Sequence, residues 1–396
     1  MLINEDSLLR FKPIYPVYRV TGSTFRIGAQ LGITAEIYDP EGQGWLLAHL
    51  MDGTRSFHEI VTAMQAQFPS LGREDIEEGV EAFDQQGFLE DAKPSSYDGI
   101  NDEPLTRFIG NVNYFSHFAK SADHRGTQQD ILRESKIALL GLGGGGSNVL
   151  PLLVASGIGH IIAVDYDRVE RTNLNRQLLY REGDIGSLKT EVAQRIVNEM
   201  NSLVDFTIVT RKITSVEDVR SVIKGADLVI CAMDEPPVLA QRRVNRACIL
   251  ENIPCLYGLS QITSGRIFSV LPYQSGCVDC LLLHGTKIDP LYIPQLKGFL
   301  NAGFTAPTMS FAPHIAKLSG LIAHEAIRLL TNYTVPQSVA KQLEYDYEAD
   351  SLQSILEWPQ YVSECPTCGT GHEKDFPLVS LYPEMNLGEK ELTIYG

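Results

Sequence analysis

The segment from Lys136 to Asp167 constrains the fold of this chain more than any other part of its sequence. It begins with an apolar run, Ile137 to Leu140, which has the length expected of a strand buried on both faces. A glycine-rich stretch follows, and the next apolar residues, Asn148 to Ser156, are predicted to form a helix with Pro151 in its first turn. Ile161 to Val164 predicts a second buried strand. These elements form a β-α-β unit and predict a doubly wound, Rossmann-like α/β sheet.

The glycines between the first strand and the helix indicate a binding site for a nucleotide. Gly143, Gly144, Gly145 and Gly146 stand where backbone N–H groups at a helix N-terminus can approach a phosphate, because no Cβ atom intrudes. Asp165 ends the second strand about 20 residues further on, where a carboxylate can bind a ribose hydroxyl. A glycine-rich turn can instead serve close packing of strand and helix. If the turn binds a nucleotide, these residues alone favour NAD.

The composition is that of an ordinary globular protein. With 396 residues, 44% hydrophobic and 21% charged, the chain is long enough for about two to three domains with ample core. Its formal net charge of −16 argues against a nucleic-acid partner and against binding to an anionic membrane surface. The N-terminal sequence MLINEDSLLRFK is not a secretion signal, and no apolar run approaches the length of a membrane span, so we expect a cytoplasmic location.

Residues 1–91 are predicted to form a separate, winged-helix-like domain. The β-prone runs are Val17–Val20, Thr24–Ile27 and Ala35–Tyr38, and the helices expected after them are Trp45–Met51, Phe57–Phe68 and Glu74–Gln86. Ser56 and Glu59 form a capping-box signature at the start of the second helix. Residues 92–105 are rich in proline, serine, glycine and acids and predict a linker, which leaves residues 106–396 for the nucleotide domain.

Four of the seven cysteines form two CxxC pairs, which predict a zinc site. Cys277 and Cys280 make the first pair, and Cys365 and Cys368 make the second, followed by Gly369 as tight metal-binding turns require. A closed set of four thiolates leaves no open position for catalysis, so the zinc ion would be structural. Two unrelated pairs, or a redox pair, are the alternative.

The residues after Asp165 resemble one particular family. The run DYDRVERTNLNRQLLY from Asp165 to Tyr180, then Asp184-Ile-Gly186 and Lys189 to Ala193, is similar to the E1-like adenylating family that includes ThiF and MoeB. Those proteins activate a carboxylate by attaching AMP to it. The resemblance therefore implies that the nucleotide is ATP rather than NAD.

The resemblance also implies roles for single residues. Arg176 and Lys189 would neutralise the phosphates of ATP, and Asp234, which follows another predicted strand, would hold Mg²⁺. The other nucleotide-binding residues would be Asp165, Asp167, Asn173, Gln177 and the glycines from Gly143 to Gly146.

One element of the family pattern is altered. The family usually carries an arginine finger in an RYxRQ segment before the first strand. Here that segment reads Arg107-Phe-Ile-Gly110-Asn111, so a glycine replaces the second arginine. Arg107 or Arg125 could take its place, and either could equally form a structural salt bridge.

Over nearly its whole length the chain resembles those members of the family that modify ribosomally made peptides, in the microcin C and pantocin A pathways. In these enzymes the N-terminal domain is PqqD-like and binds the leader of a precursor peptide as an extra strand at its sheet edge. The resemblance includes Phe304–Pro313 before a long predicted helix, His314–Leu330, and it implies a homodimer. Residues 301–313 would line the peptide pocket, with His314 and Arg266 as candidate substrate contacts. For residues 1–91 a generic winged helix or a packing appendage is the alternative.

The function implied is ATP-dependent adenylation of a carboxylate on a precursor peptide, in the biosynthesis of a peptide natural product or antibiotic. Cys231, Cys248 and Cys255 lie in apolar contexts that predict inert thiols, and no cysteine falls between Cys280 and Cys365, where E1 enzymes often keep their nucleophile. A peptide nitrogen is therefore expected to capture the acyl-adenylate, by cyclisation or AMP transfer. The alternatives are adenylation of a ubiquitin-like sulfur-carrier protein, which would not need residues 1–91, and a binding protein with an inactive nucleotide site.

Overall fold

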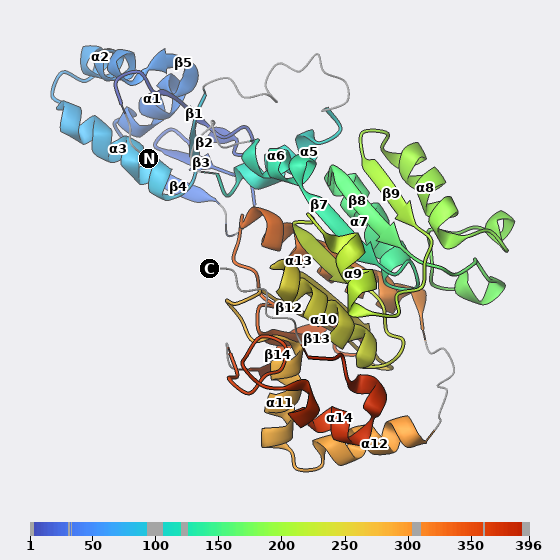
Figure 1. Cartoon of the computed structure of the whole chain (residues 1–396). Coiled ribbons are helices and arrows are strands. Elements are labelled where there is room, and N and C mark those ends of the chain that lie inside the picture. The colour runs from blue at the N-terminus through green and yellow to red at the C-terminus, as the bar shows by residue number, and fades with distance from the viewer. Residues whose placement is uncertain are drawn as a thin grey trace. The chain divides into compact units, whose positions relative to one another are not determined.

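In the computed structural model the chain forms two compact units, residues 1–131 and 132–396. Figure 1 shows the elements of both units, coloured along the chain. The structure describes residues 4–30, 32, 34–92, 106–119, 126–302, 310–358 and 361–389. Most of the predicted linker, residues 93–105, lies outside this description. No helix among the described residues is long and apolar enough to cross a membrane.

The N-terminal unit contains two small antiparallel sheets with helices packed on them. One sheet has the strand order β2-β3-β4 and the other the order β5-β1-β6. The strands are β1 (Leu8–Phe11), β2 (Val17–Thr21), β3 (Thr24–Ile27), β4 (Ala35–Tyr38), β5 (Asp52–Ser56) and β6 (Leu89–Asp91). The helices are α1 (Gln43–Leu50), α2 (Phe57–Gln67), α3 (Arg73–Gln85) and α5 (Ile109–Ser116), and α6 (Thr127–Glu134) lies at the boundary of the two units.

The sequence predicted one of these sheets and missed the other. β2, β3, β4 and the next three helices lie where they were expected, and Ser56 and Glu59 form the predicted capping box at the start of α2. The prediction of only three strands is wrong, because β1, β5 and β6 form a second sheet. β5 reads Asp-Gly-Thr-Arg-Ser, which has the composition of a turn and becomes a strand only by pairing with β1.

The helix α5 packs within the N-terminal unit, whereas the boundary expected at residue 105 assigns it to the following domain. The Nζ atom of Lys12 donates a hydrogen bond to the carbonyl oxygen of Ala119 at 2.5 Å, just beyond this helix. The Tyr15 hydroxyl bonds to the His117 ring in the same place. These two contacts join the end of α5 to the segment between β1 and β2.

The C-terminal unit is built on an eight-stranded sheet with the order β14-β13-β12-β11-β10-β7-β8-β9. The five strands from β9 to β11 in this order are parallel, and β12, β13 and β14 continue the sheet antiparallel. The strands are β7 (Lys136–Leu140), β8 (His160–Val164), β9 (Asp205–Val209), β10 (Leu228–Cys231), β11 (Cys255–Ser260), β12 (Ser264–Val270), β13 (Lys341–Asp346) and β14 (Ser351–Glu357). Ile137 to Leu140 are fully buried, as predicted for a strand covered on both faces.

Helices cover both faces of this sheet, which confirms the doubly wound α/β fold. One group contains α7, α8 and α13, since α7 contacts both α8 and α13, and α13 also packs on β10, β11 and β12. The other contains α9 and α10, which pack on each other. The helices are α7 (Gly146–Ser156), α8 (Lys189–Met200), α9 (Val216–Ile223), α10 (Leu239–Glu251), α11 (Val278–Ile288), α12 (Tyr292–Asn301), α13 (Ala312–Thr331) and α14 (Pro377–Leu381).

The helix α7 starts earlier than expected. It begins at Gly146, so Pro151 lies inside the helix and not in its first turn. The prediction for Pro151 is wrong because the glycine loop already has helical geometry two residues before Asn148. The proline cannot donate the hydrogen bond that would otherwise reach the carbonyl oxygen of Ser147.

The strand order reverses between β7 and β10, and this reversal positions the site. From β7 the chain continues to β8 on one side of the sheet, whereas β10 pairs with β7 on the other side. Ligands of open α/β sheets bind beyond the carboxyl ends of strands at such a switch point. Two segments leave the sheet there, residues 141–145 after β7 and residues 232–238 after β10.

Candidate functional site

The glycine loop after β7 has a packed side and an open side. A Cβ atom on Gly146 would lie 1.9 Å from the carbonyl oxygen of Gly141, so this position must be glycine for packing alone. A Cβ on Gly143 would meet no atom within 4 Å, and the nearest atoms for Gly144 and Gly145 would lie at 3.5 and 3.9 Å. Packing therefore explains Gly146 but not Gly143, and the open side leaves room for a ligand close to the backbone.

Asp165 holds this loop against the end of β8. Its carboxylate accepts hydrogen bonds from the backbone N–H groups of Leu142 at 2.7 Å and Asp167 at 2.8 Å. Tyr180 closes the loop as well, because its hydroxyl donates to the carbonyl oxygen of Leu142 at 2.8 Å. Burial, together with the negative charge of Asp165, raises the pKa of Tyr180 above its usual range. Each Asp165 oxygen keeps a lone pair that a ribose hydroxyl could use.

Asn148 joins the glycine loop to the segment that carries Arg176. Its Nδ2 atom donates to the carbonyl oxygens of Gly144 and Arg176, both at 2.7 Å. The Arg176 guanidinium bonds to the carbonyl oxygen of Thr172 at 3.0 Å and lies against Gly144. Asn148 was not predicted as a site residue. The available signal was a polar side chain in the first turn of an otherwise apolar helix.

The two amides of this segment, Asn173 and Gln177, differ in their bonding. Asn173 Oδ1 accepts a hydrogen bond from the backbone N–H of Glu170 at 3.0 Å, so this side chain shapes the turn. The Oε1 atom of Gln177 is buried and has no hydrogen-bond partner among the described residues. A buried acceptor without a donor is rare in native proteins, and a bound ligand could supply the missing donor.

Lys189 and Asp167 form a pair at the start of α8. Lys189 Nζ lies 2.9 Å from Asp167 Oδ2, and only 5% of the lysine side chain is exposed. The backbone N–H of Lys189 also donates to the carbonyl oxygen of Asp167 at 3.0 Å. An ammonium group has three N–H donors, so Lys189 can bind a phosphate while it keeps this partner.

Asp234 lies on the other side of the switch point, three residues after β10. Its carboxylate is exposed and makes no hydrogen bond or ion pair within the part of the chain that the structure describes. Burial lowers the pKa of Arg176, and the negative charge of Asp234 opposes this shift, so the two groups are electrostatically coupled. The segments that carry them both reach the glycine loop, because Arg176 lies beside Gly144 and Ala232, two residues before Asp234, lies beside Gly145.

These groups fit a nucleoside triphosphate with a magnesium ion. The open side of the glycine loop would accept phosphates, Arg176 and Lys189 supply positive charge, and Asp165 can bind a ribose. Mg²⁺ is usually held by one or two carboxylates together with phosphate oxygens, and the exposed carboxylate of Asp234 fits this role. The chemistry that this arrangement allows is attack on a phosphate with the developing charge neutralised by fixed cations.

The four cysteines of the two CxxC pairs lie together, fully or nearly buried. Cys277 Sγ is 3.9 Å from Cys280 Sγ and 3.5 Å from Cys365 Sγ, and Cys280 Sγ is 3.3 Å from Cys368 Sγ. A tetrahedral zinc ion with Zn–S bonds of about 2.3 Å needs sulfurs roughly 3.8 Å apart, whereas a disulfide needs about 2 Å. The cluster therefore fits a zinc ion. A Cβ on Gly371 would lie 1.9 Å from the Glu364 carbonyl oxygen, so this tight turn needs glycine.

The other residues singled out from the sequence lie elsewhere. Arg266 is already paired with Glu344 at 2.6 Å, and the His314 ring stacks on Tyr347 with centroids 4.2 Å apart. Arg107 and Gly110 belong to the N-terminal unit. Arg125 and residues 303–309, most of the segment expected to line a peptide pocket, lie outside the described residues.

A cavity of about 360 Å³ adjoins the glycine loop on the side of α7 and α8. It is mostly apolar and includes Asn148 and Ser319, the latter on α13 with its hydroxyl 3.4 Å from the carbonyl oxygen of Gly145. Leu152 and Leu178 line the cavity and remain 40% and 52% exposed. The sequence alone does not indicate this surface, because its residues come from segments that only the fold brings together.

Comparison with known proteins identifies the family. The model of the ThiF family matches residues 115–367. This chain belongs to the ThiF family. Sulfur carrier protein ThiS adenylyltransferase of Bacillus subtilis is 29% identical over 255 residues, which cover 64% of this chain and 69% of that protein. The SAMP-activating enzyme E1 of Haloferax volcanii is 32% identical over 245 residues, 61% of this chain and 83% of that protein.

The fold of this chain is also similar to that of two proteins of known structure, MccB and PaaA. The crystal structure of Escherichia coli MccB has a TM-score of 0.72 at 24% identity, covering 91% of this chain and 97% of that one. PaaA has a TM-score of 0.66 at 20% identity over 89% of this chain. At these identities the similarity shows the fold. Membership in the ThiF family makes this chain an ATP-dependent adenylating enzyme of the E1-like type.

Proposed function

We propose that this enzyme adenylates a carboxylate of a ribosomally made precursor peptide, as a step in the biosynthesis of a peptide natural product. The observation that carries the proposal is the extent of the similarities. The sequence alignment with ThiS adenylyltransferase of Escherichia coli uses 88% of that protein but only 61% of this chain. The structural similarity to MccB covers 91% of this chain and so includes most of the N-terminal unit. MccB has been solved with ATP and with N-formylated MccA.

The N-terminal unit would bind the leader of the precursor. In its sheet β2-β3-β4, the outer strands β2 and β4 each pair on one side only among the described residues. Four of the five residues of β2 are exposed, including Tyr18 and Val20. An extended peptide can add to such an edge through backbone hydrogen bonds, with side-chain contacts setting specificity.

The reaction would begin with attack of a peptide carboxylate oxygen on the α-phosphorus of ATP. The bond to the β-phosphate breaks, and pyrophosphate leaves with the electron pair. Both reactants are anionic, so Arg176 and Lys189 would neutralise the phosphates, and Asp234 would hold Mg²⁺ against them. Asp165, Asp167 and the glycine loop would position the nucleotide, with Asn173 and Gln177 shaping its pocket.

A peptide nitrogen would then attack the acyl-adenylate and lose a proton. Attack on the acyl carbon breaks the bond between that carbon and the AMP oxygen, closes a ring and releases AMP. Attack on the phosphorus instead transfers AMP to the nitrogen and releases the peptide carboxylate. A thiol nucleophile within the enzyme is disfavoured, because the three cysteines outside the zinc cluster are buried. Burial also raises the pKa of the Cys231 thiol well above its usual value, which suppresses the reactive thiolate.

A homodimer is part of the proposal. The apolar cavity beside α7 and α8, with the exposed side chains of Leu152, Leu178 and Met200, is a surface that a second copy of the chain would cover. Light scattering should give twice the chain mass for the wild type and a monomer for Leu178→Glu. A wild-type monomer would refute this part.

ATP–pyrophosphate exchange tests the function. We expect a short open reading frame beside the gene, and the peptide that it encodes should stimulate exchange. The free leader should compete while a scrambled leader does not, and Asp234→Ala should abolish exchange. Mass spectrometry of the product then separates cyclisation from AMP transfer. Exchange that needs a folded carrier protein ending in Gly-Gly, and ignores the peptide, would refute the proposal in favour of sulfur-carrier activation.

A further inference from the structure

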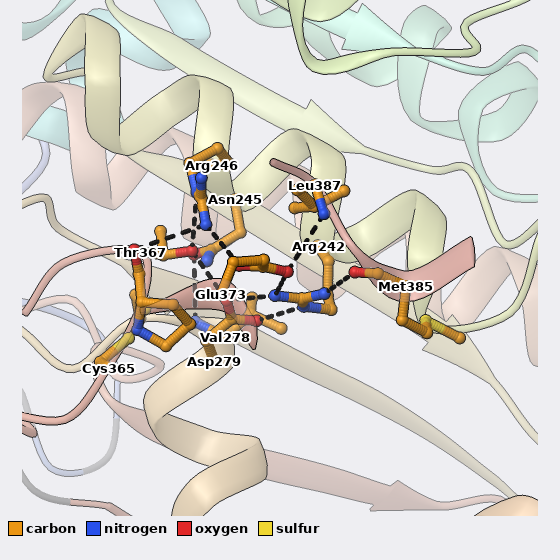
Figure 2. A network of polar contacts seen from close by, with 12 residues as sticks. Arg242, Asn245, Arg246, Val278, Asp279, Cys365, Thr367, Glu373, Met385 and Leu387 are labelled. Carbon is orange, nitrogen blue, oxygen red and sulfur yellow. Dashed lines mark hydrogen bonds and ion pairs between the residues drawn. The ribbon is translucent and has the colours of Figure 1, made fainter. Parts of the chain in front are cut away.

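Four charged side chains are buried together beside α10 and the two cysteine pairs, and Figure 2 shows how they point toward one another. Arg242 and Arg246 lie on α10, Asp279 lies between Cys277 and Cys280, and Glu373 follows the second cysteine pair. Two positive and two negative charges balance, as a buried group of ions requires. Nothing in the proposed chemistry explains why this enzyme keeps such a group.

Arg242 is the centre of the network. Its Nε and Nη2 atoms donate to the two carboxylate oxygens of Asp279 at 2.8 and 3.0 Å, and Nη2 also donates to Glu373 at 2.8 Å. Its Nη1 atom donates to the carbonyl oxygen of Met385, and the Phe376 ring lies 4.1 Å from the guanidinium carbon. All three nitrogens of this guanidinium therefore donate to the C-terminal tail or to the first cysteine pair.

Arg246 and Asn245 extend these contacts one turn along the same face of α10. Arg246 Nη2 donates to Glu373 at 2.7 Å, and its Nε donates to the Thr367 hydroxyl at 3.0 Å. Asn245 Oδ1 accepts from the backbone N–H of Val278 at 3.0 Å. Val278 belongs to the first cysteine pair and Thr367 to the second, so this face of α10 is fixed to both.

The N-terminal turn of α10 contacts the segment that carries Asp234. The helix α10 begins five residues after Asp234, and Gln241, next to Arg242, donates from Nε2 to the carbonyl oxygen of Met233 at 3.2 Å. On the sheet side, the backbone N–H of Ala232 donates to the carbonyl oxygen of Leu140 at 2.9 Å. Among the described residues the Asp234 carboxylate makes no hydrogen bond or ion pair, so its position depends on its backbone, which the first turn of α10 helps to fix.

We propose that Arg242, Arg246 and Glu373 are positioning residues, which fix α10 to the cysteine cluster and thereby hold Asp234 where it can bind the magnesium ion of ATP. The inference rests on the magnesium role proposed for Asp234. A packed helix moves as a rigid body, so loss of the network would displace Gln241 and the Met233–Asp234 backbone together. The cysteine cluster has no open position for catalysis. Through α10 it would nevertheless influence the affinity of the enzyme for ATP in the presence of Mg²⁺.

The test is the affinity for ATP measured by calorimetry with and without added Mg²⁺, in metal-depleted buffer without a chelator so that the cysteine cluster keeps its ion. The readout is the ratio of the Kd without Mg²⁺ to the Kd with it. In Glu373→Gln this ratio should fall by about 2- to 30-fold, the range of coupling that residues remote from a ligand exert, while the Kd without Mg²⁺ stays within about twofold of wild type.

Two further variants keep the test decisive if Glu373→Gln does not fold. Gln241→Leu cuts the contact to Met233 without touching the network, so the ratio should fall while zinc content stays at the wild-type level. Glu251→Gln is the matched control. Glu251 ends α10 and pairs with Arg220 at 2.7 Å, so its loss loosens the far end of the helix and should leave the ratio unchanged.

The outcomes distinguish a wrong magnesium role for Asp234 from a wrong positioning role for Arg242, Arg246 and Glu373. If Asp234→Ala keeps the wild-type ratio, the magnesium role of Asp234 is wrong and the positioning inference falls with it. If Asp234→Ala brings the ratio of the two Kd values to about one, but Glu373→Gln and Gln241→Leu keep the wild-type ratio, only the positioning inference is wrong. An equal loss of affinity with and without Mg²⁺ in these variants would indicate general loosening and would also overturn it.

Discussion

Two alanine substitutions in the glycine loop should have opposite effects on stability and on nucleotide binding. In Gly146→Ala the new methyl would lie 1.9 Å from a backbone oxygen of Gly141, which cannot rotate away as a side chain would. Overpacking of this kind costs about 3 kcal/mol when the backbone must shift. For a unit of this size that corresponds to a melting temperature roughly 6–12 °C lower.

Gly143→Ala is the matched change. Its Cβ meets no atom within 4 Å, so stability should stay the same or rise by about 0.5 kcal/mol from the lower entropy of the unfolded chain. The methyl would occupy the space where a phosphate approaches the backbone, and the affinity for ATP should fall about tenfold or more, equivalent to 1.4 kcal/mol or above.

Scanning calorimetry and ATP titration of both variants provide the assay. A Gly146→Ala protein as stable as wild type would refute the packing argument. A Gly143→Ala protein that binds ATP with wild-type affinity would refute the placement of phosphates on the open side of the loop.

Three other changes test neighbouring parts of the site. Asn148→Ala leaves the carbonyl oxygens of Gly144 and Arg176 without their donor and should lower the free energy of unfolding by about 1–3 kcal/mol, measured by urea denaturation. ATP binding should also weaken. Unchanged stability would show that the two segments are not joined there. The purified protein should contain one zinc ion per chain by mass spectrometry, and Cys365→Ser should lose both the metal and thermal stability; metal retained in this variant would count against a four-thiolate site. Because the folded-state pKa of Tyr180 is raised, the unfolded state loses the phenolic proton first, so the free energy of unfolding should fall as the pH rises above about 10. This fall should be smaller in Tyr180→Phe. Equal slopes for both proteins would contradict the assigned burial effect.

The sequence was sufficient for the parts of the fold that local signals determine. Ile137–Leu140 in β7 and Ile161–Val164 in β8 are uninterrupted apolar runs, and Ser56 with Glu59 is a capping signal that needs no tertiary context. The strand β5 is different, because Asp-Gly-Thr-Arg-Ser favours a turn and forms a strand only beside β1. The helix start at Gly146 follows from the helical backbone angles that Gly145 already adopts, and a run of glycines gives no sequence signal for them.

The nucleotide-binding roles of the site residues stay a prediction from residue type, spacing and the family pattern, and these signals do not indicate the contacts that support the site. In the structure Arg176 lies beside Gly144, and Asp234 follows β10 at the switch point. Asn148 and Tyr180 hold the glycine loop through backbone carbonyl oxygens, and a contact to backbone imposes no pattern on the sequence of the partner. The buried pairing of Arg242 with Asp279 and Glu373 was missed for a related reason, since each charge alone is typical of a surface residue.

The separation of the two cysteine pairs sets an order for completing this protein during its synthesis. Cys277 and Cys365 are 88 residues apart in the chain. At about 5–20 residues per second, the ribosome adds the second pair roughly 4–18 s after the first. When the ribosome has added the first cysteine pair, the parallel strands and the glycine loop have already been made. Glu373, the partner of Arg246, has not yet been added. A nascent chain can thus assemble its nucleotide half first, and an unfinished chain differs from a finished one by the solvent-exposed arginine face of α10.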